Sequence, residues 1–243
     1  MWTRTSTYKY NSYFSENASR NDNLEQQAQA LYRSWFVDFE PFKGGKFVDS
    51  ELGKIPKNWK IVPFNEILSI SNKKTEFNNI PEYSITNTGI YPRETKFNKQ
   101  LSSSSSDNKL IKCNDLVFGM SREILNWGLM EEEIGGVSPA YTVYNIDNRI
   151  VNPVFLKLFI RSRIELFRDL IRPAAREGQS VDKQVLMAKY IFIPTSDVLD
   201  KFWNIYNIMV ESDKIVSKES ANLIKIRDSL LPKLMSGELK VSE

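Results

Sequence analysis

Histidine is absent from this chain of 243 residues, and its absence removes several kinds of chemistry. Without an imidazole the chain itself holds no Ser-His-Asp triad, no histidine general base and no His-ligated metal. Cys113 is the single cysteine, which excludes internal disulfides and cysteine-rich zinc sites and fits a reducing compartment. Within LIKCNDLVF, Cys113 is interpreted as a small buried residue at a strand edge.

Long apolar runs are missing as well. The segment MWTRTSTYKYNSYFSENASRND has no apolar core of the signal-peptide kind, and no later stretch has about 18 uninterrupted apolar residues. We therefore expect a cytoplasmic protein with no membrane partner. The charge is only mildly basic, with 33 Lys and Arg against 30 Asp and Glu, a net charge of +3. That balance permits a polyanionic partner without requiring one.

The first part of the chain contains one short helix. Residues 1–20 have no clear period and are expected to be irregular. Over residues 21–42, apolar positions recur at helical spacing, and Pro41 with the glycines after it predicts an end near residues 38–40. The apolar positions are Leu24, Ala28, Leu31 and Trp35. A helix this short is marginal alone in water, so its apolar face needs a partner.

Residues 43–194 combine strand-like and helix-like segments, as is typical of one mixed domain. Five segments rich in Ile, Val, Tyr and Phe, bounded by turn residues, are predicted strands. They are WKIVPFNEILSI, PEYSITNTGI, KLIKCNDLVFGM, GGVSPAYTVYNI and KYIFIPT. NPVFLKLFIRSRIELFRDLI, before the last strand, is predicted to form a single helix. Strands in runs with a few helices favour an α+β domain.

Residues 195–243 predict a long helix. Thr195 or Ser196 suits the N-cap and Gly237 the end. Five apolar residues spaced by sevens predict a coiled-coil seam, namely Phe202, Met209, Val216, Leu223 and Leu230. About 40 helical residues span roughly 60 Å, more than a small domain's diameter, so the helix needs another helix along it.

The two helical segments repeat each other. Asn23-Leu24 matches Asn222-Leu223 at an offset of 222 − 23 = 199 residues. The same offset pairs Leu31 with Leu230, Tyr32 with Leu231, Trp35 with Leu234 and Phe36 with Met235. Apolar matches alone are expected between any two amphipathic helices. The common Asn-Leu start and the paired apolar residues at the end favour a true repeat. The parent order would be domain, helix, domain, helix, with antiparallel helices holding two domains at a fixed span.

Two stretches resemble a known family. NLEQQAQALYRSWFVDFEPFKGG…GKIPKNWKIVPFNEI is similar to the central junction of the specificity (S) subunits of type I restriction-modification systems. REGQSVDKQVLMAKYIFIPTSDVLDKFWNIY…LIKIRDSLLPKLMSGEL is similar to the end of their second target-recognition domain and the helix after it. The resemblance covers about residues 20–240, and SWFVDFEPF and RDSLLPKLMSGEL are its most specific parts.

The resemblance implies a subunit without catalysis of its own. S subunits carry two target-recognition domains, each recognising half of a split DNA sequence, and dock methyltransferase (M) subunits. The M subunits bind S-adenosylmethionine and methylate adenine, while restriction (R) subunits use ATP and Mg²⁺ to cut DNA. No cofactor is expected in this chain. It has one recognition domain and only the end of the first helix, so we expect a half-length or truncated S subunit.

DNA recognition needs phosphate contacts and base contacts. Residues 161–176 are rich in arginine, which is typical either of a solvated helix face or of a phosphate-binding edge. The best-placed phosphate candidates are Arg172 and Arg176, beside Gln179. Candidates for base contacts on exposed loops are Asn87, Arg93, Lys96, Arg122 and Asn126. Trp35 and Phe36 are expected to pack at helical spacing and not to stack on bases.

Two other classes of function remain open. An enzyme is disfavoured because VNPVF lacks the second proline of an Asn-Pro-Pro-Phe methyltransferase site and no P-loop is present. Scattered pairs such as Glu51 and Lys54 leave a nuclease possible. The other alternative is an inactive remnant that pairs with an intact S or M subunit without recognising DNA.

The long helix also predicts that the chain pairs with a second S fragment. Half subunits are expected to form a homodimer, or to pair with another S fragment, through the helix seam. The short first helix is hypothesised to compete for the partner's docking groove, so that deleting residues 1–40 would strengthen dimerisation.

Overall fold

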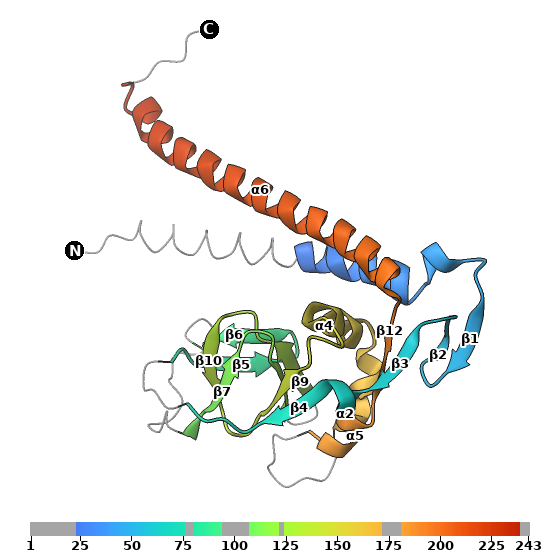
Figure 1. Ribbon diagram of the computed structural model, residues 1–243. Helices are drawn as coiled ribbons and strands as arrows, with labels where there is room; N and C mark the ends of the chain where they lie inside the picture. Colours follow the sequence, from blue (N-terminus) through green and yellow to red (C-terminus); the bar gives the residue numbers. More distant parts are fainter. Residues whose placement is uncertain (1–22, 76–79, 94–106, 122–123, 172–180, 239–243) are drawn as a thin grey trace. The chain divides into compact units, whose positions relative to one another are not determined.

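The computed structural model describes residues 23–75, 80–93, 107–121, 124–171 and 181–238. The chain divides into two compact units, one of residues Met1–Leu31 with Ser196–Glu243 and the other of residues Tyr32–Thr195. We call the first the helical unit and the second the strand unit. A mixed α+β fold that continues into a long C-terminal helix is confirmed (Figure 1).

The long helix, α6, runs from Ser196 to Met235, as the periodicity predicts. Asp197 in the first turn and Lys233 in the last both suit the helix macrodipole. After the helix, Gly237 adopts a φ of 73° and its amide donates to the carbonyl oxygen of Leu234 at 3.2 Å. A left-handed residue at this position commonly ends a helix and favours glycine, so the predicted end is confirmed.

Residues 23–36 are helical and join the two units. The helix ends slightly before the expected position, and Phe39 then adopts a left-handed conformation with a φ of 54°. A short 3-10 turn, η1 (Glu40–Phe42), follows. A bulky residue at positive φ is strained, and ring contacts with Phe47 and Trp59 accompany it, with centroids 5.5 and 5.8 Å away.

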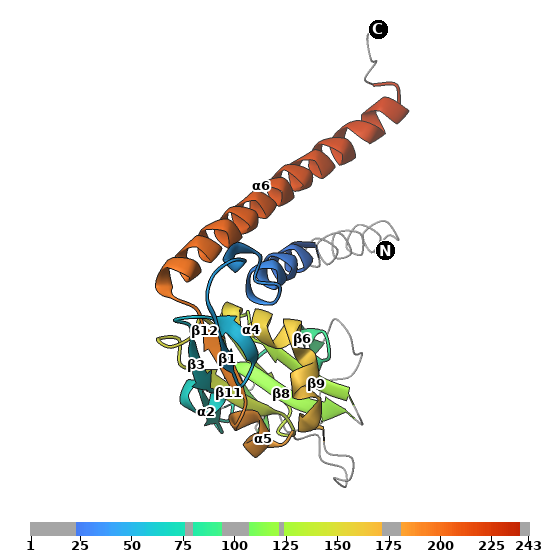
Figure 2. The same ribbon diagram turned by 90° about the vertical axis from the view of Figure 1, so that its right-hand side faces the viewer.

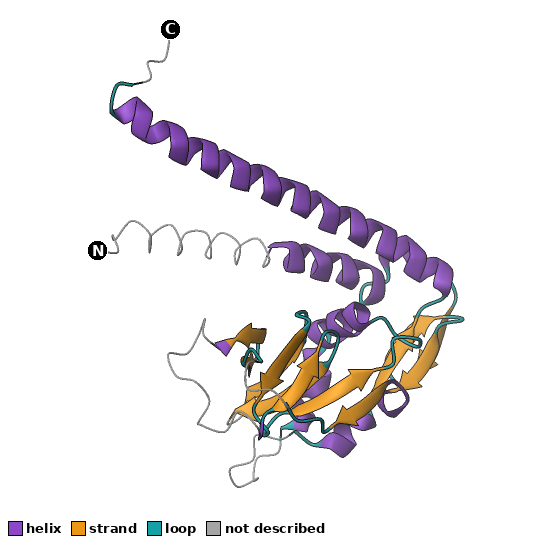
Figure 3. Cartoon of the chain, turned by 60° about the vertical axis from the view of Figure 1, so that its left-hand side comes forward, coloured by secondary structure: helices purple, strands orange, loops and turns teal. Residues whose placement is uncertain are grey.

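The strand unit is built from short antiparallel pairs around one four-stranded sheet (Figure 3). That sheet has the order β4 (Leu68–Ser71), β11 (Thr142–Ile146), β8 (Leu116–Ser121), β9 (Ile124–Leu129). The two-stranded pairs are β1 (Phe47–Ser50) with β2 (Gly53–Pro56), β3 (Lys60–Pro63) with β12 (Tyr190–Ile193), β5 (Tyr83–Thr86) with β6 (Gly89–Pro92), and β7 (Lys109–Lys112) with β10 (Ile134–Val137). All five predicted segments contain strands, but only KYIFIPT forms a single strand. The other four each contain parts of two strands, and a helical turn over Phe64–Ile67 divides WKIVPFNEILSI. The β1–β2 hairpin and β9 are not among the predicted strands.

The predicted single helix before β12 is wrong, because it breaks in two. Asn152 caps α4 (Pro153–Ser162) by accepting hydrogen bonds from the amides of Val154 and Phe155, at 2.8 and 3.3 Å. Arg163 then leaves helical geometry, and the chain continues as the 3-10 segment η3 (Ile164–Leu170). Two short helices complete the unit, α2 (Phe64–Ile67) and α5 (Lys183–Met187). In Figure 2, α4 and α5 lie on opposite sides of strands β8 and β11.

Aromatic rings fill the core of the strand unit. Phe36, from the first helix, lies 5.1 Å from Phe155 and 5.7 Å from Trp59 between ring centroids. Phe192 of β12 lies 5.5 Å from Phe159 of α4. Because the end of the first helix supplies part of this core, the strand unit is not complete without it.

No helix within the described ranges is both long and apolar enough to cross a membrane.

Candidate nucleic-acid interface

The turn between β5 and β6 presents one exposed amide side chain on a tightly bonded frame. The Thr86 hydroxyl accepts from the amide of Thr88 at 3.2 Å and lies 2.9 Å from the Thr88 hydroxyl. The Tyr91 hydroxyl lies 3.2 Å from the Thr88 hydroxyl, and Gly89 has a φ of 140°. Asn87, at the tip, is exposed and makes no hydrogen bond to the residues that the structure describes. We call residues 86–89 the Asn87 turn.

Arg161 supports this turn from α4. Its Nη2 donates to the carbonyl oxygen of Thr88 at 2.9 Å, and its guanidinium lies over the Trp127 ring, 5.9 Å from the centroid. Trp127 lies in β9 and is buried. The Arg161 side chain therefore links the turn that carries Asn87 to α4 and to Trp127 of β9.

Arg93, just after β6, is half-buried and lies beside the same pair of strands. Its amide donates to the carbonyl oxygen of Glu82 at 2.8 Å, and its Nη1 lies 3.5 Å from the Ser84 hydroxyl. The structure thus brings Asn87 and Arg93 to one hairpin. Their contacts with bases stay a prediction.

The expectation of an exposed loop is wrong for Asn126. It lies within β9, opposite Gly119 of β8, and only 7% of its surface is exposed. The polar sequence Ser-Arg-Glu before β9 is typical of a loop, so the sequence does not indicate that Asn126 lies in a strand. Lys96, Arg122, Arg172, Arg176 and Gln179 lie outside the described residues.

The arginines that the structure describes within residues 161–176 do not share one helix face. Arg161 ends α4, Arg163 follows it, and Arg168 lies in η3. Arg163 is half-buried, and its Nη2 donates to the carbonyl oxygen of Phe36 at 3.4 Å. Arg168 is exposed and pairs with Glu165 at 2.6 Å. Among these three, Arg168 therefore has the solvated environment of an ordinary surface ion pair.

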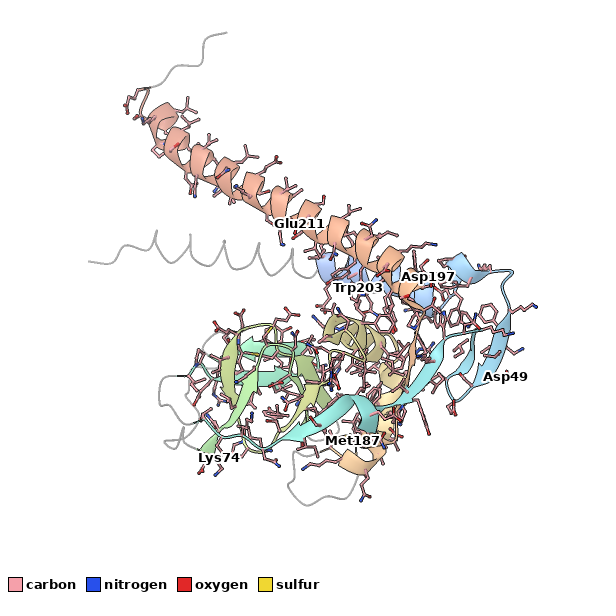
Figure 4. All side chains as sticks on the ribbon, viewed as in Figure 1. Asp49, Lys74, Met187, Asp197, Trp203 and Glu211 are labelled. Atoms are coloured by element: carbon pink, nitrogen blue, oxygen red, sulfur yellow. The ribbon has the colours of Figure 1, made fainter. Side chains whose placement is uncertain are left out.

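The helix seam is exposed along most of α6, the helix on which Figure 4 labels Trp203 and Glu211. Phe202 alone of the five seam residues is buried, with its ring 5.1 Å from that of Trp203. Val216, Leu223 and Leu230 are 51%, 65% and 41% exposed, and Met209 is half-buried. Such a row of exposed apolar side chains on a long helix is typical of a surface that pairs with another helix.

The two copies of the repeat differ sharply in burial. Tyr32 and Phe36 have no exposed surface, whereas their counterparts Leu231 and Met235 are 51% and 81% exposed. The packing role predicted for Phe36 is confirmed, and Trp35, which is half-buried, lies 6.3 Å from Phe42 between ring centroids. Leu24 and Leu31 are half-buried. Burial of Tyr32 raises the pKa of its phenol well above the ordinary value.

Cys113 is exposed after β7, so the buried position predicted for it is wrong. The described residues include no group of three or more Cys, Asp and Glu side chains arranged to hold a metal ion.

No protein-family profile matches the chain. Its sequence is 29% identical over 242 residues to the type I restriction enzyme MjaIX specificity subunit of Methanocaldococcus jannaschii. The alignment covers 92% of this chain and 55% of that protein. The resemblance to specificity subunits is confirmed. The chain spans about half the length of this curated relative.

Solved structures of the same kind of protein are also similar. An S subunit from M. genitalium matches with a TM-score of 0.48 and 13% identity, over 95% of this chain and 59% of that one. The HsdS subunit from Thermoanaerobacter tengcongensis matches with a TM-score of 0.43 and 11% identity, over 97% and 56%.

Proposed function

We propose that this chain is a half-length specificity subunit that recognises one half of a bipartite DNA target. The observation that carries the proposal is the match with a specificity subunit along 92% of the chain. In this role the chain is not itself catalytic. It directs adenine methylation by M subunits and cleavage by R subunits, and S-adenosylmethionine, ATP and Mg²⁺ belong to those partners.

Base recognition is assigned to the Asn87 turn. An amide side chain matches the donor and acceptor pair that adenine presents in the major groove. Asn87 is exposed, uncommitted among the described residues and held by a turn bonded to Arg161. A turn that is held by hydrogen bonds before binding favours discrimination between bases, because little conformational freedom is lost on binding.

Pairing of two recognition units is assigned to α6. The exposed seam over Val216, Leu223 and Leu230 suits a second copy of this helix, or the corresponding helix of another S fragment. A twofold pairing would place two recognition domains on an inverted split site. The burial of Tyr32 and Phe36 disfavours the hypothesis that the first helix yields its groove to a partner. Deleting residues 1–40 is no test of it, because the deletion removes core side chains.

The test uses the full chain together with its M subunit. The complex is incubated with a pool of random duplexes at moderate salt, and retained DNA is sequenced. We expect enrichment of one short sequence, or of two inverted copies at a fixed gap. If M binds the chain and no sequence is enriched, the chain is a remnant that only pairs. Cleavage of plasmid DNA by the chain alone with Mg²⁺ would make it a nuclease.

A further inference from the structure

The β1–β2 hairpin and its flanks carry most of the chain's excess charge. Residues 43–60 contain five lysines against two acidic residues, Asp49 and Glu51. The lysines are Lys43, Lys46, Lys54, Lys57 and Lys60, and all five are exposed. The net charge of this segment is +3, which equals that of the whole chain, so the remaining residues together are neutral. We call residues 43–60 the basic hairpin.

Two of these lysines oppose each other without a counterion. The amide of Lys57 donates to the carbonyl oxygen of Lys46 at 2.8 Å, directly beyond the Phe47–Pro56 pair of the ladder. Like charges at opposed positions of antiparallel strands are destabilising. Lys43 pairs with Glu40 at 2.7 Å, whereas Lys46, Lys54 and Lys57 form no ion pair with any residue that the structure describes. Lys54 lies opposite Asp49 in the ladder but forms no ion pair with it, so the ammonium groups of all three lysines are available to an anion.

The basic hairpin is held in place by buried and aromatic contacts. A two-stranded hairpin alone is marginal in water. Ile55 is only 2% exposed, and the Phe47 ring lies 5.5 Å from that of Phe39. Ser50 closes the turn, donating from its hydroxyl to the carbonyl oxygen of Gly53 at 2.6 Å. The lysines therefore extend from a fixed backbone. Figure 4 shows Asp49 at the outer edge of the hairpin.

We propose that the basic hairpin binds the phosphate backbone of the DNA. The inference rests on the proposed function, and it adds a sequence-independent contact to it. Lysine acts on phosphate as a point charge and needs no shaped pocket. It is depleted in protein–protein interfaces, which disfavours a protein partner for this surface.

The position of the hairpin sets where this contact falls on the DNA. Within the strand unit, the basic hairpin and the β5–β6 pair lie at opposite ends (Figure 1). A compact unit of this size is roughly 40 Å across, and one turn of B-DNA is about 34–36 Å long. The lysines would thus meet phosphates about one helical turn from the bases that the Asn87 turn recognises.

The test compares two triple variants of the full chain in complex with the M subunit. The first is Lys46→Gln with Lys54→Gln and Lys57→Gln, and the control replaces the same lysines with Arg, which keeps the charge. Affinity for the selected target and for a scrambled duplex is measured by fluorescence anisotropy over a range of salt concentrations. Tryptophan fluorescence of each variant before it is mixed with the M subunit checks that the chain is folded.

For the Gln variant, the slope of log K against log salt should become shallower by about 3, or roughly one per lost contact. Affinity should fall by at least about tenfold for both duplexes, with their ratio preserved, and the Arg variant should keep the wild-type slope. If the slope does not change, the proposal is overturned. Loss of M-subunit binding without DNA would instead identify the hairpin as a protein-docking surface.

The same data separate this proposal from the proposed function. A wild-type complex that binds both duplexes equally, with a slope that the Gln variant lowers, supports the phosphate contact and contradicts sequence recognition. A wild-type complex that prefers the target, with a slope that the Gln variant keeps, overturns the phosphate contact alone. A wild-type complex that binds neither duplex overturns both.

Discussion

The guanidinium of Arg163 donates a hydrogen bond to the carbonyl oxygen of Phe36, 3.4 Å away and 127 residues earlier in the chain. It also lies over the rings of Phe192 and Phe159, 5.5 and 5.9 Å from their centroids. Burial lowers the pKa of Arg163, and the nearby Tyr32 acts in the opposite direction. The cation thus sits at the C-terminal end of the first helix, where the macrodipole favours positive charge.

Arg163→Ala should destabilise the chain. The substitution leaves the Phe36 carbonyl without its charged donor and removes the contact with two rings, so the free energy of unfolding should fall by about 2–3 kcal/mol. Arg168→Ala is the matched control, because Arg168 forms only an exposed pair with Glu165 and should change stability by less than about 0.5 kcal/mol. Urea unfolding followed by tryptophan fluorescence measures both. A change as small as that expected for the control would show that Arg163 does not stabilise the chain.

The two copies of the repeat should respond differently to matched substitutions. Phe36→Ala empties a fully buried position and should cost about 3–5 kcal/mol of folding stability. Met235→Ala, at the corresponding position of α6, removes a side chain that is 81% exposed, so it should change the stability of the isolated chain by less than about 0.5 kcal/mol. Urea unfolding at low protein concentration, where the chain is monomeric, makes the comparison. A large loss for Met235→Ala would mean that this helix end is buried in the isolated chain.

The repeat predicts where the two helices end, but it does not predict which helix end is buried. Periodicity and an offset of 199 residues identify two similar helix ends, because both have the same apolar spacing. Burial depends on what surrounds each end. Phe155, Trp59 and Phe192 surround Phe36, and no local pattern relates those positions to it. The helices are therefore predictable from sequence, while the buried copy is not.

The candidate base-contact residues also differ in how far the sequence predicts their positions. Asn87 is predictable as an exposed loop residue, since Asn and Gly in Thr-Asn-Thr-Gly favour turns. Its support is not, because Arg161 bonds to Thr88 across 73 residues. The burial of Asn126 is not predictable, because the polar Ser-Arg-Glu before it favours a loop, whereas β9 begins at Ile124 and its next five residues are buried.

The Asn87 turn should carry discrimination between bases and little of the overall affinity. Asn87→Ala removes one pair of hydrogen bonds to a base edge, so preference at a single position of the target should fall by roughly 10- to 100-fold. Binding to scrambled DNA should be unchanged because phosphate contacts remain. Competition between duplexes that differ at one base pair, with the M subunit present, measures this.

Arg161 should act through the same turn as a positioning residue. Arg161→Ala removes the bond to the Thr88 carbonyl and the contact with Trp127, so preference at the Asn87 position should weaken. Arg161→Lys keeps one charged donor and should retain part of that preference. If Arg161→Ala instead weakens target and scrambled DNA equally and lowers the salt slope, Arg161 contacts phosphate directly.

The bend between β11 and α4 should show a pH dependence of known sign. The Arg149 side chain donates to both carboxylate oxygens of Asp147, at 2.9 and 2.6 Å, and its amide donates at 3.0 Å. These hydrogen bonds lower the pKa of Asp147 to about 2. Since the ordinary value in an unfolded chain is about 3.9, the folded state binds its proton less readily than the unfolded state. The stabilisation is therefore complete above about pH 4 and is lost as the pH falls toward 2.

Carbon NMR of the Asp147 carboxyl group tests this directly. In the wild-type chain the carboxyl signal should titrate near pH 2, and Arg149→Ala should move the midpoint up toward the ordinary value. A midpoint that stays near 2 in Arg149→Ala would show that the bend itself, and not the arginine, stabilises the Asp147 carboxylate.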